Sequence, residues 1–409
     1  HGTQWTAQVD YSNPINENKK IESGLRSYIN DYASVFNSYN VDRGDKIKLP
    51  LSNNYEYQEQ IHAAYFTFTN RIKSFGYQLG LRGEYSKFNG RLIDSAQSFG
   101  YQYPSSIKTI WDALFPSIFL SEKISDQDEI QLNYSRRVKR PSFWELNPFI
   151  DINDPQNIQQ GNPALRPEFR NSFELNYSKT YGANNNFLVS GYYHNTLGDI
   201  TRYSDTITAS QYEKLQNSGV DPNAILNTFI NANSTNTAGL EMILKQKVLK
   251  GWDIAPSFSI AYRKVNAEVG DMSLNNSGAI WRAKMQSTYK MSPANEKSFF
   301  SNFSVQVNAQ YQSPRVIPQG RELEDYSMDL ALKKDIFKDN KGSIVFAIND
   351  VFDTRRRGTI YDTPTFYQES YSRWRTRSFK LTFSYRFGDP NFQLFKRNGG
   401  NEEGGDFDS

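Results

Sequence analysis

The stretch NFSVQVNAQY, residues 302–311, has an apolar side chain at every second position. Near the end of the chain, SFKLTFSYRF at 378–387 shows the same alternation, and weaker copies occur at 130–134, 173–177 and 258–262. Successive side chains of a β-strand point to opposite faces, so each stretch predicts a strand with one apolar and one polar face. In the two clearest stretches the second face is made of Asn, Ser, Gln, Thr, Lys and Arg, which suits contact with water.

The composition is unusual for a soluble core. Of 409 residues, 15% are aromatic but only 37% are hydrophobic, and the mean hydropathy is −0.70. A membrane-spanning helix needs a run of about 20 apolar residues, and none is present in the sequence. Strands that face lipid on one side and a polar lumen on the other would give this mixture. Composition alone leaves a soluble β-sandwich or lectin-like protein equally open.

Charge and motifs exclude several functions. The 47 basic and 44 acidic residues nearly cancel, so charge gives no argument for a nucleic-acid partner. The absence of cysteine excludes disulfides and zinc–cysteine sites. There is no His-Glu-x-x-His or Gly-x-Ser-x-Gly motif, and His1, His62 and His194 suit packing or lumen lining. We therefore expect no enzymatic activity and no cofactor or metal.

The alternating segments continue along the chain and predict about fifteen strands. They are expected at roughly 3–11, 19–37, 54–69, 75–88, 109–122, 129–137, 169–180, 185–196, 236–247, 252–264, 278–290, 299–311, 324–334, 342–351 and 377–387.

The joins between these strands alternate in length. Short joins such as Gly182–Asn184 and Lys250–Gly251 alternate with long ones such as 138–168 and 197–235. Outer-membrane barrels have short periplasmic turns and long extracellular loops, whereas a soluble sandwich has no reason to sort its loops this way. The sequence therefore predicts an all-β protein, an antiparallel up-and-down transmembrane β-barrel in the outer membrane.

Strand parity predicts that the barrel is partial. The last join is long, so the final strand runs toward the periplasm, and with fifteen strands the first one does too. An odd number of strands would then precede this chain, for example seven in a barrel of 22. We expect residues 1–388 to be the C-terminal portion of a barrel and 389–409, rich in Gly, Asn and Glu, to be a disordered periplasmic tail. Pro256 predicts a bulge or a local loss of pairing.

Four segments resemble a known family. GNPALRPE at 161–168 closely resembles the signature that opens a mid-barrel strand in TonB-dependent receptors, and YSRR at 134–137 is similar to the preceding strand end. NDVFD at 349–353 resembles the end of the penultimate strand, and FSYRF at 383–387 resembles the terminal aromatic signal read by the barrel-assembly machinery. The Asn- and Tyr-rich style resembles the outer-membrane β-barrel family common in Bacteroidetes.

This resemblance implies an activity and partners. Such receptors import siderophores, cobalamin, oligosaccharides or peptides, driven through TonB acting on a plug domain, and no plug or coupling segment is recognised in these residues. The implied partners are outer-membrane lipid and lipopolysaccharide, the barrel-assembly machinery, TonB through the absent plug, and a surface lipoprotein. Two other classes stay open, which are a barrel for adhesion or assembly without energised transport, and a soluble carbohydrate-binding β-protein.

Candidate contact residues lie where upward strands end. Arginines here can pair with phosphates of lipopolysaccharide or with an anionic substrate, and the alternative is a solvated rim with local acidic partners. Aromatic side chains can stack on a substrate or form the interfacial girdle. The candidates are Arg136, Arg137, Arg140, Trp144, Arg355, Arg356, Arg357, Tyr361 and Trp374. Phe383, Tyr385 and Phe387 are the expected assembly signal.

Overall fold

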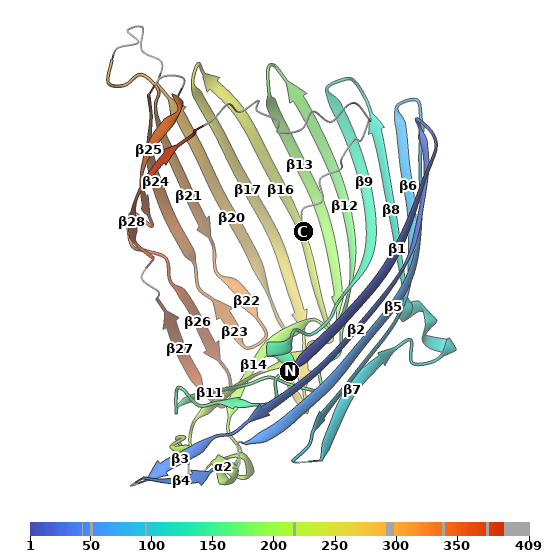
Figure 1. Ribbon diagram of the computed structural model, residues 1–409, viewed down its shortest axis with the longest axis vertical. Coiled ribbons are helices and arrows are strands. Elements are labelled where there is room, and N and C mark those ends of the chain that lie inside the picture. Colours follow the sequence, from blue (N-terminus) through green and yellow to red (C-terminus); the bar gives the residue numbers. More distant parts are fainter. Residues whose placement is uncertain are drawn as a thin grey trace.

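The computed structural model describes residues 1–42, 44–49, 52–94, 96–215, 218–291, 298–337, 340–373 and 376–387. They form a sheet of 16 strands, 15 of them on one continuous path, which curves into the open wall shown in Figure 1. Among these residues, no helix is long and apolar enough to cross a membrane. The last residues of the predicted 1–388 barrel portion and the whole predicted tail, 389–409, lie outside the described residues.

Every strand on the path pairs antiparallel with its neighbours in sequence, which confirms the up-and-down prediction. In the described part of the chain the sheet is not closed, and β1 and β28 form its two edges. The strands are β1 (Gly2–Asn16), β2 (Lys19–Phe36), β5 (Asn53–Ile72), β6 (Phe75–Leu92), β8 (Leu114–Lys123), β9 (Asp128–Lys139), β12 (Glu168–Tyr181), β13 (Asn185–Leu197), β16 (Ser234–Leu249), β17 (Trp252–Asn266), β20 (Asn276–Lys290), β21 (Phe303–Gln312), β24 (Asp325–Ile336), β25 (Gly342–Asn349) and β28 (Ser378–Tyr385). The extra strand, β7 (Gln97–Tyr103), pairs with β6.

Each of the fifteen predicted strands corresponds to one of these, and two begin four or five residues later than expected. The strand predicted at 109–122 begins at Leu114, because Ile107–Ala113 form a short 3₁₀ helix, η1. The strand predicted at 299–311 begins at Phe303. Pro256 causes the expected local loss of pairing. Within the described β16–β17 ladder, pairing passes from Ile243–Ser257 to Gln246–Ile254 without a pair at Pro256, and the register does not change.

The two faces of the sheet differ in chemistry. One row across neighbouring strands consists of Leu132, Leu175, Gly191, Leu240, Ile260 and Trp281. The adjacent row, on the opposite face, consists of Gln131, Asn176, Ser190, Glu241, Ser259 and Arg282. Many large apolar side chains of the first face are exposed, so that face meets lipid and the polar face lines the lumen.

The two edges of the wall have different connections. At the upper edge in Figure 1, six joins have two to five residues, namely 17–18, 73–74, 124–127, 182–184, 250–251 and 337–341. The seventh, 291–302, is longer than predicted, and its central residues 292–297 lie outside the described residues. At the lower edge the joins are 37–52, 93–113, 140–167, 198–233, 267–275, 313–324 and 350–377. The predicted sorting of turns and loops is therefore present, with this one exception.

The long loops fold into small elements of their own. One sheet joins β10 (Ile150–Asp151), β11 (Asn157–Gln160), β15 (Ile225–Asn231) and β14 (Ile200–Thr206), and a second joins β22 (Arg315–Ile317), β23 (Gly320–Glu322), β26 (Arg357–Asp362) and β27 (Tyr367–Ser372). Two hairpins are β3 (Tyr39–Asp42) with β4 (Asp45–Lys48), and β18 (Glu268–Val269) with β19 (Met272–Ser273). The helices are α1 (Phe143–Leu146) and α2 (Ala209–Leu215).

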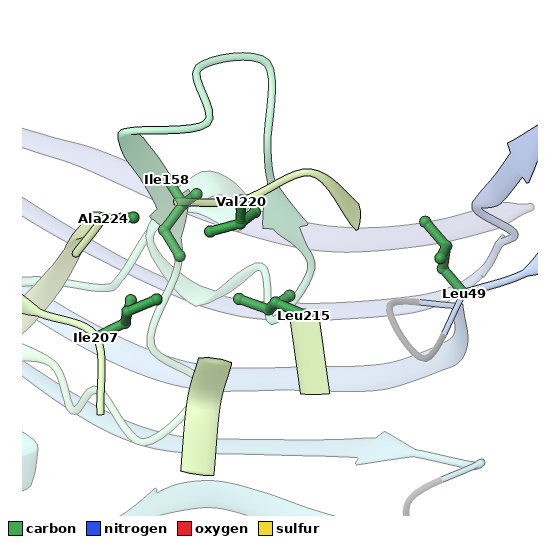
Figure 2. Packing of buried hydrophobic residues seen from close by; sticks show 6 residues of the cluster. All are labelled: Leu49, Ile158, Ile207, Leu215, Val220 and Ala224. Atoms are coloured by element: carbon green, nitrogen blue, oxygen red, sulfur yellow. The ribbon is translucent and has the colours of Figure 1, made fainter. Parts of the chain in front are cut away.

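These loops pack together into what we name the cap, formed by the joins 37–52, 140–167, 198–233, 313–324 and 350–377 as far as they are described. Leu49, Ile158 and Leu215 come from three different joins and are buried in one apolar cluster with Ile207, Val220 and Ala224, as Figure 2 shows. The side chain of Gln319 also binds the backbone of Ser204 twice, accepting from its amide and donating to its carbonyl, each at 2.7 Å. The loop end is therefore a folded layer with its own core.

Candidate functional site

The lumen face carries a dense group of charged side chains next to the cap, which we name the lumen patch. It lines a cavity of about 590 Å³. Its cations are Arg170, Arg263, Arg282, Lys284 and Arg315, and its anions are Glu168, Glu174, Asp199 and Glu241. The sequence analysis missed these residues, although each is a polar position of an alternating strand or directly follows one in the flanking loops.

Some charges of the lumen patch neutralise each other. Arg263 donates to Asp199 at 3.0 Å, and Asp199 also accepts from the Thr235 hydroxyl at 2.5 Å. Arg315 pairs with Glu322 through two hydrogen bonds of 2.8 and 2.5 Å.

Other cations of the patch are differently placed. Arg170 contacts Nδ1 of His194, whose ring stacks on Tyr192 at 4.7 Å. Among the described residues, Arg282 and Lys284 form no ion pair within 4.0 Å. These two side chains are available to an anionic group that enters the lumen.

The predicted basic group at 136–140 is divided between the two faces. Arg136 follows Tyr134 on the outer face, and its guanidinium donates to the carbonyl of Trp111 at 2.6 Å and lies 3.7 Å from Asp112. Arg137 is exposed on the lumen face, opposite Arg170. Sequence proximity therefore does not bring these two arginines into one site.

Arg140 lies on the lumen side, directly after the end of β9. It forms an ion pair with Glu84, donates to the Tyr103 hydroxyl at 2.5 Å and lies 3.9 Å from Glu59. The Glu84 carboxylate also accepts hydrogen bonds from Arg82 at 2.8 Å and from the Tyr103 hydroxyl at 2.6 Å. Burial lowers the pKa of Arg140 to about 10, against the opposing effect of Glu59, so Arg140 is charged at neutral pH. These contacts agree with the alternative of a rim with local acidic partners. A contact of Arg140 with lipopolysaccharide or substrate stays a prediction.

Trp144 is the exposed end of an aromatic chain. Its side chain is 75% exposed, and its ring meets Phe143 edge-on at 5.4 Å. Phe143 contacts Tyr32, and Tyr32 stacks on Tyr57 at 5.1 Å. Further rings continue into the buried cluster of Phe88, Tyr101, Tyr103 and Phe115. Trp144 is thus placed on the surface where it can stack on a ligand or a sugar.

The second basic group, 355–357, lies in the loop after β25. The side chain of Arg355 points to the lumen and donates to the Ser327 hydroxyl at 2.9 Å, and its backbone amide donates to Asp350 at 3.0 Å. Arg356 lies over the Tyr371 ring at 5.2 Å from its centre. Arg357 opens β26, opposite Ser372.

Asp350 organises this loop. Its buried carboxylate accepts from the Thr354 amide at 3.0 Å, from the Arg355 amide and from the hydroxyls of Thr354 and Thr376. Burial works against ionisation, but these hydrogen bonds outweigh it, so the pKa of Asp350 lies below its ordinary value. The turn is therefore stabilised by the charged form.

The remaining candidates are two aromatic residues of the loop after β25 and the expected assembly signal. Tyr361 is buried in β26, opposite Gly320, and packs in the small loop sheet. Trp374 lies outside the described residues. Phe383 and Tyr385 of β28 are exposed on the outer face, and Phe387, also exposed, follows the strand. Within the described ranges, no group of three or more His, Asp or Glu side chains could hold a metal ion.

A curved antiparallel sheet with an apolar outer face and a charged lumen face defines a transmembrane β-barrel. The chain belongs to the outer membrane protein beta-barrel family, whose sequence model matches residues 1–385. It is therefore a protein of the outer membrane. Among curated protein sequences, none matches this chain.

Solved structures with a similar fold are receptors and transporters. The ferric yersiniabactin uptake receptor FyuA from Yersinia pestis superposes with a TM-score of 0.63 at 12% identity, over 95% of this chain and 54% of that one. The copper transporter OprC gives 0.61 at 11% identity, over 94% and 57%. The pyoverdine receptor FpvA from Pseudomonas aeruginosa gives 0.59 at 13% identity, over 94% and 53%. The chain thus spans about half the length of these proteins, and the likeness establishes the fold.

Proposed function

We propose that the chain forms most of the barrel of an energised uptake receptor, which imports a nutrient across the outer membrane. The charged lumen wall supports this proposal most strongly. Fifteen strands already exceed the roughly eight whose side chains fill a barrel interior, and barrels of about 22 strands enclose a plug. A barrel that served only adhesion would make its contacts through its loops. A polar lumen is common to both classes, so the cations of the lumen patch that have no carboxylate partner in the described structure are the feature that favours uptake.

Within this proposal, Arg282 and Lys284 contact an anionic group of the substrate or of the plug. Both project from β20 into the lumen, two residues apart on the same face, and within the described structure they lack a carboxylate partner. Arg is suited to bidentate pairing with carboxylate, and Lys adds a second positive charge beside it. A siderophore, an oligosaccharide or a peptide, with TonB acting through a plug, stays the proposed class of substrate and the proposed driving partner.

The other proposed partners follow from position on the surface. Phe383 and Tyr385 end the last strand on the lipid face, where an assembly machine could read them. The exposed Trp144 and the cap offer a surface for a lipoprotein or an extracellular ligand. An origin in Bacteroidetes and the absence of enzymatic activity belong to the same proposal.

The test uses the full receptor, expressed in the outer membrane of cells that lack it. Depletion of small molecules from the medium is followed by mass spectrometry, together with accumulation of ⁵⁵Fe supplied as ferric citrate, before and after the proton gradient is collapsed. We expect at least one compound to be taken up only with the receptor and only with the gradient. The double variant Arg282→Gln/Lys284→Gln should slow this uptake, whereas the lumen control Gln306→Asn should not. No receptor-dependent uptake of any compound would favour the adhesion or assembly class.

A further inference from the structure

The segment Ile107–Ala113, η1, stands out from the outer face of the barrel between β7 and β8, at the right of Figure 1. Its three large apolar side chains are exposed, with Ile107 at 89% and Trp111 at 71%, and Ile110 lies between them. They lie within five consecutive residues of this 3₁₀ segment, and together we name them its apolar face. From this geometry we propose that η1 inserts this face into the outer leaflet at the membrane interface and anchors the loop edge of the barrel there.

The height of η1 on the wall supports this assignment. It leads directly into β8, whose ten residues cross the wall to the turn at 124–127 on the opposite edge. At about 3.3 Å per residue and a tilt of about 40°, these ten residues rise roughly 25 Å, the height of the apolar band of a barrel. The segment therefore begins where the lipid-facing band ends.

The neighbouring strands mark the same boundary. On the outer face of β9, Tyr134 packs against Phe173 with ring centres 4.7 Å apart, an aromatic pair of the kind that flanks the apolar band. The next outward residue of β9 is Arg136. Its guanidinium donates to the Trp111 carbonyl at 2.6 Å and lies over the Phe169 ring, and its side chain is only 16% exposed. Trp111 is therefore held closer to the loop edge than the aromatic pair, by one outward-facing residue of β9.

Arg136 acts as a positioning residue for η1 in this arrangement. It binds the backbone of Trp111 and faces the carboxylate of Asp112, so the helix end is fixed to the wall while its apolar face stays free. A Trp at this height suits the interface, because its ring is apolar and its N–H can reach water or headgroups. Lys108, exposed in the same turn, can extend its ammonium toward lipid phosphates.

The apolar face of η1 continues the lipid-facing surface of the sheet, which identifies lipid as its occupant. Exposed apolar residues of the outer face, including Ile118 in β8 and Leu132 in β9, lie on the adjoining strands toward the short turns. The inference concerns membrane placement and does not depend on the uptake activity proposed above.

The test uses the absence of cysteine from the chain, which allows single nitroxide labels to be placed without background. In the full receptor in lipid vesicles, labels at Ile107→Cys and Ile110→Cys are compared with a lipid-facing control, Leu132→Cys, and a loop control, Tyr367→Cys. Collisions with oxygen report the acyl region, and collisions with a water-soluble nickel chelate report water. We expect both η1 labels to keep oxygen accessibility and to show nickel accessibility below that of the Tyr367 control, between it and the Leu132 control.

Two outcomes would overturn the proposal. Nickel accessibility equal to that of the Tyr367 control would place η1 in water, and low accessibility to both reagents would mean that protein covers it. Adding Arg136→Gln to the Ile110→Cys variant should raise nickel accessibility, and an unchanged value would refute the positioning role. Heat-modifiable migration on a gel shows that each variant is folded, and Asp112→Asn serves as a milder replacement if Arg136→Gln does not assemble.

Discussion

Met242 and Ile243 are neighbours in β16 that face different solvents. Their side chains have similar exposed fractions, 41% and 36%, but Met242 lies on the outer face between Val189 and Phe258, while Ile243 lines the lumen with Ser257 and Lys284. Replacing each of them with Arg therefore tests which solvent lies on each side.

The size of the effect follows from position. Met242 lies near the middle of β16, where Arg on the lipid face costs about 2–4 kcal/mol. That cost lowers the folding equilibrium constant roughly 30- to 900-fold. At Ile243 the new charge meets water, with Glu241 and Lys284, which carry opposite charges, on the same face. We therefore expect a loss below about 1 kcal/mol, the range of exposed charge pairs.

The assay is equilibrium unfolding of the full receptor in guanidinium, in phospholipid vesicles. Tryptophan fluorescence follows unfolding, and heat-modifiable migration confirms folding before denaturant is added. Equal losses for Met242→Arg and Ile243→Arg, or a larger loss for Ile243→Arg, would refute the assignment of the two faces.

Three further perturbations address the loop end. Gln319→Ala should leave the buried backbone groups of Ser204 without partners, at about 1–3 kcal/mol, and speed hydrogen exchange of its amide, whereas unchanged exchange would show that the two loops are not joined there. Because the pKa of Asp350 is lowered, its contribution to loop stability is present above the ordinary value of 3.8 and is lost as pH falls through the lower folded pKa. Asp350→Asn should therefore make proteolysis of residues 350–373 fast already at pH 6 and remove its acid dependence, and an acid dependence like that of the unchanged receptor would contradict this. Gly320→Ala should open the small loop sheet, because φ is +154° there and an added Cβ would overlap the carbonyl oxygen of Ile360; an unchanged amide exchange pattern in β26 would argue against it.

Alternation was sufficient to predict the wall, because a strand between lipid and water must sort its side chains at every second position. The same two-residue period places Arg136 and Arg137 on opposite faces of the sheet, and the sequence could have predicted this. The sequence could not indicate where the Arg140 side chain lies after the strand ends, since its partner Glu84 is 56 residues away. The strand predicted at 109–122 began too early because it included the apolar residues Ile110 and Trp111. A short apolar run does not distinguish a strand from a helical turn.

The cap was not predictable for a different reason. Its sheet pairs residues 157–159 in parallel with residues 225–227, and its core takes side chains from three loops. Such contacts have no local period, so the loops looked like unstructured connections. For the same reason Tyr361, predicted at the surface, is buried in a loop sheet.

The central claim is that the long loops face the exterior and the short turns face the periplasm. Labelling of intact cells with a membrane-impermeant maleimide tests it directly, with one cysteine at Glu213 in α2 and, in a second variant, one at Asp126 in the β8–β9 turn. The account predicts that Glu213→Cys reacts on intact cells and that Asp126→Cys reacts only after the outer membrane is permeabilised. Reaction of Asp126→Cys on intact cells, with Glu213→Cys protected, would contradict it.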